Sequence, residues 1–307
     1  MQCCGHILMI RPVNFGFNAE TAVNNAFQVN SSGNVQQKAL EEFDGLVSLL
    51  SENKVSLTVI TDTEIPHTPD SIFPNNWISF HEDGTVFIYP MFAANRRLEK
   101  KPHIFENLNE NLIITEVKDL SRYETENHFL EGTGSMVLDR ENRIAYASLS
   151  PRTDKHILGE FCSMAGYTPC SFTSADNSGN AIYHTNVMMC VADKFAVICL
   201  DAIRDEQERL MVSGSLKGSG KEIIDISLQQ INAFAGNMLQ VRNSEGELLL
   251  VMSSQAFGSL NTEQVKRLEK FSRIIHTPLD TIESCGGGSA RCMMAEIFNK
   301  NSTQISV

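Results

Sequence analysis

Five polar residues recur at a nearly constant spacing and include the side chains that nucleophilic catalysis needs. They are Asn76, Glu131, His184, Asn237 and Cys292, separated by 55, 53, 53 and 55 positions. A cysteine thiolate can attack an electrophilic carbon, and a histidine can transfer protons to and from the reacting groups. A carboxylate can accept hydrogen bonds from substrate N–H groups. If the fold brings these residues together, they predict covalent hydrolysis through a thiol.

Cys292 follows three consecutive glycines, Gly286 to Gly288, and we expect it on a short buried strand over residues 289–297. Glycine lets backbone amides approach a ligand closely. Taken alone, Cys292 is more simply a core cysteine, because free cysteines are among the most buried residues. The regular spacing favours the nucleophile over the core residue.

A strand–strand–helix–strand unit recurs with the same period. In chain order the expected elements are strands 77–80 and 85–89, helix 96–110 and strand 111–117; strands 135–138 and 144–149, helix 154–165 and strand 167–172; strands 186–191 and 195–200, helix 204–213 and strand 222–226; and strands 237–242 and 248–252, helix 262–275 and strand 278–282.

A fifth unit can be assembled from the two ends of the chain. Strand 289–297 has no helix after it, whereas strand 7–10, helix 35–53 and strand 55–60 are the pieces it lacks. Closure of a repeat array removes exposed sheet edges. We therefore predict an α/β fold, a five-bladed α/β propeller of ββαβ units with pseudo-fivefold symmetry, in a single catalytic domain over residues 1–307. Equivalent positions of such a ring converge near its axis.

The composition limits the class of protein. Of 307 residues, 42% are hydrophobic and 20% are charged, which is typical of a globular protein, and the formal net charge is −12. This acidity argues against nucleic-acid and anionic-membrane partners. Eight cysteines without metal-ligand spacing indicate reduced thiols, so we expect no metal and no cofactor. Without a signal-like or membrane-spanning run, we expect a cytoplasmic location, with a homo-oligomer left open.

A long segment near the N-terminus, residues 14–34, has neither helical nor strand periodicity. It carries Phe15 and Phe17 beside a glycine. Loops of this length are usually functional or disordered. We weigh a lid over the site equally against a disordered connection.

Several motifs together resemble the guanidino-group-modifying superfamily, the penteins, which includes arginine deiminases, dimethylarginine dimethylaminohydrolases and amidinotransferases. Residues 69–76 look like the dimethylaminohydrolase substrate loop, residues 130–134 like its acidic-Gly-Gly motif, and residues 149–154 like its Arg-Thr-Asn segment. Residues 184–186 resemble the deiminase motif of His, any residue, Asp, and residues 286–292 resemble its Gly-rich turn and catalytic cysteine. The resemblance covers nearly the whole chain and implies the pentein fold.

Two departures from the family pattern bear on the substrate. Asn76 stands where deiminases have a carboxylate, and Asn186 stands where they have Asp; of the acidic positions only Glu131 clearly remains. An amide donates as well as accepts, so such a site suits a neutral ureido group better than a guanidinium. The resemblance then implies the citrulline-hydrolase branch, with ornithine, ammonia and CO2 as products. Arginine deiminase, arginine dihydrolase and dimethylarginine dimethylaminohydrolase are the alternatives, followed by an amidinotransferase and a non-catalytic binding protein.

The catalytic roles implied are a thiolate nucleophile at Cys292, proton transfer by His184 and substrate N–H binding by Glu131. Donors from Asn76 or from the Gly286–Gly288 backbone would stabilise the tetrahedral oxygen.

The remaining candidates bind the rest of a small amino-acid substrate. By the resemblance to the dimethylaminohydrolases, Arg96 and Arg152 align with arginines that bind the substrate α-carboxylate there. The alternative is a solvated helix-end charge, which we prefer for the neighbouring Arg97. Asp70 could hold a substrate N–H or cap a turn, and Phe73 could pack on substrate methylenes or belong to the core. Asn186 and Asn237 complete the set of substrate-binding candidates, and Asn237 could simply hydrogen-bond backbone.

Overall fold

The structure is a computed structural model that describes residues 1–30 and 33–300. Its strands form five three-stranded sheets, ordered β15-β1-β2, β3-β4-β5, β6-β7-β8, β9-β10-β11 and β12-β13-β14. The strands are β1 (His6–Arg11), β2 (Ser56–Thr61), β3 (Ile78–Phe80), β4 (Thr85–Ile88), β5 (Glu116–Asp119), β6 (Val137–Asp139), β7 (Ile144–Ser148), β8 (Thr168–Phe172), β9 (Met189–Val191), β10 (Phe195–Ile198), β11 (Glu222–Asp225), β12 (Leu239–Arg242), β13 (Leu248–Ser253), β14 (Arg273–Thr277) and β15 (Ala295–Ile297).

Each sheet repeats one pairing scheme, in which the central strand pairs antiparallel with one neighbour and parallel with the other. The two ends of the chain share a sheet, as predicted: His6 of β1 lies opposite Ile297 of β15 on one side and opposite Ser56 of β2 on the other. The mixed α/β class and the five repeated units are therefore present.

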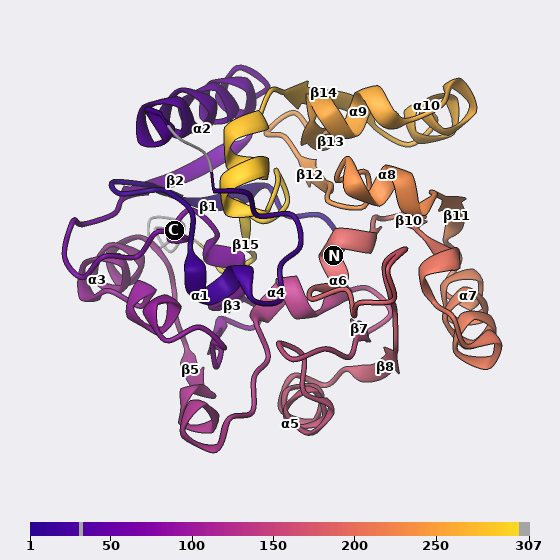
Figure 1. Ribbon diagram of the computed structural model, residues 1–307, viewed down its shortest axis with the longest axis horizontal. Coiled ribbons are helices and arrows are strands. Elements are labelled where there is room, and N and C mark those ends of the chain that lie inside the picture. The colour runs from indigo at the N-terminus through magenta and orange to yellow at the C-terminus, as the bar shows by residue number, and fades with distance from the viewer. Residues whose placement is uncertain (31–32, 301–307) are drawn as a thin grey trace, which may run out of the picture.

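The longer helices lie at the periphery, whereas α4, α6 and β15 lie near the centre of the molecule (Figure 1). The helices are α1 (Ala19–Ala22), α2 (Val35–Glu52), α3 (Pro102–Asn111), α4 (Gly132–Ser135), α5 (Lys155–Ala165), α6 (Thr185–Met188), α7 (Glu206–Gly218), α8 (Leu228–Asn232), α9 (Ser254–Ser259) and α10 (Thr262–Glu269), with 3-10 helices η1 (Pro74–Asn76), η2 (Asn95–Glu99), η3 (Ser121–Glu126) and η4 (Leu200–Ala202) and the π-helical turn η5 (Ile282–Gly286).

Two predicted helices were wrong in their extent. The helix predicted over 96–110 is interrupted at Lys101, because Pro102 disfavours a helical residue before it and starts a new helix itself. The strand after it is β5, later than the predicted 111–117. The helix predicted over 262–275 ends at Glu269, and its strand is β14 instead of 278–282.

Three predicted strand starts next to the repeated polar residues were also wrong. Residues 132–135 and 185–188 are single helical turns that precede β6 and β9. Only Ala295–Ile297 of the predicted strand 289–297 is a strand, so Cys292 lies in the turn before β15. These segments are buried on every side, and a continuously buried run shows no period that separates a turn from a strand.

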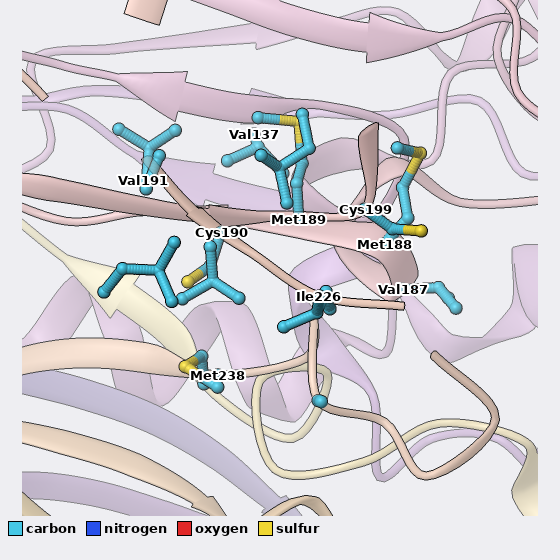
Figure 2. Packing of buried hydrophobic residues seen from close by; sticks show 14 of the residues in the cluster. Val137, Val187, Met188, Met189, Cys190, Val191, Cys199, Ile226 and Met238 are labelled. Carbon is cyan, nitrogen blue, oxygen red and sulfur yellow. The ribbon is translucent and has the colours of Figure 1, made fainter. Parts of the chain in front are cut away.

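The core comprises clusters between neighbouring sheets. In one of them, Met189 of β9 lies beside Val137 of the adjoining β6, and Cys190 and Met238 belong to the same cluster (Figure 2). Burial raises the pKa of the Cys190 thiol to about 12. Structural cysteines of this kind stay protonated and unreactive. Among the described residues, no helix is long and apolar enough to cross a membrane.

Candidate active site

A small cavity lies where the repeated polar residues meet. It is lined by Thr21, Asn25, Asp70, Phe73, Asn76, Arg96, Arg152, Tyr183, His184, Gly286, Gly287, Gly288 and Cys292. Its free volume is about 20 Å³, enough for roughly one water molecule. A larger cavity of about 660 Å³ lies alongside and shares Asn25 and Tyr183 with it, but it contains none of the five repeated residues. Three of the five repeated residues, Asn76, His184 and Cys292, therefore line the small cavity and none lines the larger one.

The constant spacing has a structural cause, since each repeated residue precedes the first strand of its sheet. Asn76 ends η1, Glu131 and His184 are the N-cap residues of α4 and α6, and Asn237 and Cys292 lie shortly before β12 and β15. Equivalent positions of the five sheets thus bring the five residues together, with Glu131 and Asn237 hydrogen-bonded to the cavity-lining His184 and Cys292.

Two glycines allow Glu131 to sit this close to its neighbours. Gly132 has φ +47°, a left-handed value that favours glycine, and a Cβ there would lie 2.4 Å from the carbonyl oxygen of Asn75. A Cβ on Gly134 would lie 2.4 Å from Asn76 Nδ2 and 2.8 Å from His184 Nδ1. The Gly-Thr-Gly sequence after Glu131 is therefore required by close packing at the site.

His184 is a neutral base held by Glu131. Its Nε2 lies 2.7 Å from Glu131 Oε2, and the side chains are 3% and 0% exposed. Burial lowers the pKa of His184 to about 4, against the opposing effect of Glu131. Burial also opposes ionisation of Glu131, but the charge of Arg152 and the hydrogen bond from His184 hold its pKa well below the usual range. The ionised carboxylate accepts the Nε2 proton, so Nδ1 is the basic nitrogen.

Both Glu131 oxygens already have protein donors. Oε1 accepts from the backbone N–H of Phe92 at 2.9 Å, and Oε2 accepts from His184 and lies 3.5 Å from Arg152 Nη1. In this structure Glu131 therefore positions His184. Each carboxylate oxygen can accept a further hydrogen bond, so the predicted contact with substrate stays a prediction.

The Cys292 sulfur is bordered by two amide donors. Asn237 Nδ2 lies 3.2 Å from Sγ and Asn186 Nδ2 lies 3.5 Å from it. Asn237 is itself fixed, because its Nδ2 also donates to Asn186 O at 2.9 Å and its Oδ1 accepts from the backbone N–H of Arg291 at 3.0 Å. N–H donors favour the anionic form of sulfur. Asn237, the weakest candidate in the sequence, therefore bonds both backbone and the candidate nucleophile.

Arg96 and Arg152 are each only 2% exposed, so their alternative interpretation as solvated charges is wrong. Arg96 Nε and Nη2 donate to Glu99 at 2.8 and 3.0 Å, and its Nη1 donates to Asn76 Oδ1 at 2.8 Å. Arg152 donates to Asn24 Oδ1 at 2.8 Å. In this structure both guanidinium groups bind protein acceptors; recognition of a substrate carboxylate stays a prediction.

The neighbouring Arg97 is partly exposed, at 31% of its side chain, and donates to the carbonyl oxygens of Met91 and Phe92 at 3.0 and 3.2 Å.

Glu131 is not the only carboxylate at the site. Asp70 and Glu99 are also buried beside Arg96. Burial raises the pKa of Glu99 to about 7 against the opposing charge of Arg96. Sequence reasoning missed Glu99, although its position three residues after Arg96 on one turn allows this ion pair.

Asp70 and Phe73 both lie in the cavity wall. Asp70 Oδ2 accepts from Asn18 Nδ2 at 2.7 Å and from Thr21 Oγ1 at 3.1 Å, and burial raises the pKa of Asp70. The Phe73 ring is 3% exposed and packs against the Gly-rich turn, where a Cβ on Gly288 would lie 2.9 Å from it. Phe73 is therefore a core residue and a wall residue together.

Residues 14–30, which we call the strap, cross the cavity. Asn25 Nδ2 and Gln28 Nε2 donate to the carbonyl oxygens of Gly287 and Gly286 at 3.3 and 2.8 Å, and Val29 N donates to Ser284 O at 2.7 Å. Residues 31–32 of the predicted lid lie outside the described residues. Residues 14–30 thus contact the Gly-rich turn, and the choice between a lid and a disordered connection stays a prediction. These three contacts could not be found from sequence, because they join a segment without periodicity to a turn about 260 positions away.

Three buried polar atoms at this site have no hydrogen-bond partner among residues 1–30 and 33–300. They are Asp70 Oδ1, Asn76 Nδ2 and Asn186 Oδ1. Buried polar groups normally have partners, so an unmatched set points to a ligand. Two acceptors and one donor match a group that carries N–H bonds and one oxygen. Within the same residues, no group of three or more His, Cys, Asp or Glu side chains is arranged to hold a metal.

A family model described as "N,N dimethylarginine dimethylhydrolase, eukaryotic" matches residues 11–299. The arginine dihydrolase ArgZ of cyanobacteria has a TM-score of 0.74 and 19% identity, over 94% of this chain and 40% of ArgZ. Its N-terminal domain alone, bound to substrate, gives the same values over 95% of this chain and 97% of the domain. DDAH from Pseudomonas aeruginosa, complexed with citrulline, has a TM-score of 0.65 and 14% identity, over 96% of this chain and 100% of that one. No curated protein matches the chain.

Proposed function

The chain belongs to the eukaryotic N,N-dimethylarginine dimethylhydrolase family, within the pentein guanidino-modifying superfamily, and from this premise we propose that it hydrolyses citrulline to ornithine, ammonia and CO2. The catalyst is the thiol of Cys292, acting on the C–N bond of a ureido amino acid. We also propose that residues 1–307 form one catalytic domain, with the five sheets closed as a five-bladed propeller.

One observation supports the choice of substrate: two neutral amides have an unpartnered atom, Asn76 in the pocket wall and Asn186 beside the Cys292 sulfur. Asn76 Nδ2 offers a donor and Asn186 Oδ1 offers an acceptor. A ureido group carries one acceptor oxygen and several N–H donors, so it satisfies both. A guanidinium carries only donors and would leave Asn76 Nδ2 without a partner.

In the first half of the reaction, Cys292 passes its proton to Nδ1 of neutral His184, and sulfur bonds to the ureido carbon. Negative charge develops on the tetrahedral oxygen, and this oxygen accepts a hydrogen bond from Asn76 Nδ2. The bond between the carbon and the ornithine side-chain nitrogen then breaks, and His184 returns the proton to that nitrogen. Ornithine leaves, and a carbamoyl group remains on sulfur.

In the second half, water loses a proton to His184 and adds to the carbamoyl carbon. The carbon–sulfur bond breaks, and His184 returns the proton to sulfur, which restores the thiol and the neutral histidine. Carbamic acid departs and decomposes to ammonia and CO2, so one water is consumed for each citrulline. Glu131 keeps Nδ1 of His184 directed at the reacting groups in both halves.

The second candidate is an arginine dihydrolase, and a specific observation favours it. Three buried carboxylates, Asp70, Glu99 and Glu131, surround two guanidinium groups, Arg96 and Arg152. When all are ionised, this leaves one negative charge that a cationic substrate could balance.

Product analysis separates the two candidates. Ornithine from citrulline but not from arginine supports the citrulline hydrolase, and ornithine from both supports the dihydrolase. Citrulline accumulating from arginine would indicate a deiminase, and dimethylamine from dimethylarginine would indicate the activity in the family's description. Cys292→Ala is the control for each substrate.

Substrate entry requires the strap to move, because a cavity of about 20 Å³ cannot admit an amino acid. We propose that the strap, residues 14–30, is a lid held shut by Asn25 and Gln28. Gln28→Ala removes a 2.8 Å hydrogen bond to Gly286 O and should speed proteolysis within the strap. Protection by citrulline in a Cys292→Ser protein supports the lid; an unchanged cleavage pattern on ligand addition argues against it.

A further inference from the structure

Arg96 holds the Asn76 side chain in one orientation. Its Nη1 donates to Asn76 Oδ1 at 2.8 Å, in a buried contact. A guanidinium has no acceptor, so Asn76 must turn its oxygen toward Arg96 and its Nδ2 away from it. That nitrogen has no partner within residues 1–30 and 33–300. It lies beside Nδ1 of His184, since both atoms are within 3 Å of the place where a Cβ on Gly134 would be.

Glu99 in turn fixes Arg96. The contact is bidentate, at 2.8 and 3.0 Å, and the two side chains are 2% and 1% exposed. Two other carboxylates, those of Asp70 and Glu131, lie 3.9 Å from Arg96 nitrogens and compete for the same cation. The guanidinium keeps its place against this competition because Glu99 occupies two of its N–H groups.

We propose that Glu99 and Arg96 are positioning residues that make the pocket specific for a substrate oxygen at Asn76. This inference rests on the proposed function. It assigns the choice between a ureido and a guanidino substrate to Glu99, which acts through Arg96 from outside the cavity lining. With Nδ2 presented, the complementary atom is the ureido oxygen. With Asn76 reversed, Oδ1 would be presented, and a guanidinium N–H would be its partner.

Glu99→Gln tests this assignment. A glutamine cannot neutralise Arg96, which is then drawn to Asp70 or Glu131 and releases Asn76. The Asn76 amide is free to rotate, so the donor is lost from the pocket for part of the time. We expect kcat/KM for citrulline divided by kcat/KM for arginine to fall by about tenfold or more, and the ratio of the two affinities to fall likewise. This is the factor that the loss of one buried hydrogen bond produces.

The binding measurement uses the Cys292→Ser protein at pH 8, with citrulline and arginine as separate ligands in a calorimeter. Asp62→Asn is the matched control. Asp62 Oδ1 forms a buried ion pair with Lys101 Nζ at 2.6 Å, Lys101 lies two positions after Glu99, and Asp62 does not line the cavity. We expect this control to keep the wild-type ratio. Glu99→Asp retains a carboxylate and should recover part of the citrulline preference that Glu99→Gln loses.

Asn76→Asp provides a second test that does not depend on the folding of the Glu99 variant. Aspartate offers oxygen in either orientation, so this variant should shift preference toward arginine by itself. Glu99→Gln added to it should change the ratio no further, because there is no amide left to orient.

Two outcomes overturn the inference: an unchanged citrulline-to-arginine ratio in Glu99→Gln, whether or not both ligands bind more weakly, or a further shift when Glu99→Gln is added to Asn76→Asp. Failure of the proposed function is distinct, because it appears in the wild-type chain as the absence of citrulline turnover. Failure of this inference leaves wild-type turnover intact.

Discussion

Gly134→Ala should disable the site without unfolding the chain. The added Cβ would lie 2.4 Å from Asn76 Nδ2, 2.8 Å from His184 Nδ1 and 2.9 Å from His184 Cε1. Ordinary contact begins near 3.4 Å, so Asn76 has to retreat by about 1 Å and His184 by somewhat less. Gly134 does not have a positive φ, so alanine fits its backbone and the effect is confined to these two side chains.

The magnitude follows from that displacement. A misplacement of about 1 Å at reacting groups costs on the order of 10²-fold in rate. We therefore expect kcat/KM for citrulline to fall about a hundredfold, equivalent to about 2.7 kcal/mol of transition-state stabilisation. Overpacking should cost only about 1–3 kcal/mol of unfolding free energy.

The assay is ornithine release at several citrulline concentrations, with urea unfolding measured on the same samples. Gly159→Ala is the matched control, since Gly159 is an exposed position of α5 with no heavy atom within 4 Å of its added Cβ. It should keep full activity and gain up to about 1 kcal/mol from helix propensity. A Gly134→Ala enzyme with wild-type kcat/KM would refute the placement of Asn76 and His184 at the reacting carbon.

Asn237→Ala should slow iodoacetamide alkylation of Cys292 at pH 7 by about tenfold, because it removes the donor 3.2 Å from sulfur; the exposed Asn232→Ala is the control, and equal rates would remove Asn237 from the site. Buried His184 and His81 have pKa values lowered by burial to about 4 and about 3. Between pH 6.5 and 4 the unfolded chain binds protons at these histidines that the folded chain does not. The unfolding free energy therefore falls as pH falls through this window, by about 3 kcal/mol for His184. In urea unfolding at pH 7 and pH 4.5, the His184→Asn variant should show a smaller fall in unfolding free energy than the wild type. The same fall in both proteins would contradict a buried neutral His184.

The convergence of the five polar residues could be predicted from sequence for a physical reason. Each stands before the first strand of a sheet, and the sheets repeat, so constant spacing becomes a common location in space. The same reasoning failed for the predicted strand residues 186–188 and 289–294, where an unbroken buried run looks like a strand whether it turns or extends. It also failed for Glu99, because its partner Arg96 was assigned to substrate.

The strap contacts lay beyond any sequence signal. Asn25 and Gln28 bond backbone carbonyl oxygens of the Gly-rich turn, and such bonds depend on backbone direction and not on residue pattern. The predicted role of Glu131 was incomplete for a similar reason, since its two oxygens accept hydrogen bonds from Phe92 N and His184 Nε2. Position in the repeat identified the residue, and only its hydrogen bonds defined what it does.

The central claim is that Cys292 bonds to the ureido carbon of citrulline. The direct measurement is acid quenching of the enzyme during turnover of citrulline labelled with carbon-13 at the ureido carbon, followed by peptide mass spectrometry. The account predicts a labelled carbamoyl group on the peptide that carries Cys292, and neither label nor ornithine with Cys292→Ala. Ornithine formed by Cys292→Ala at the wild-type rate, or label on another cysteine, would contradict it.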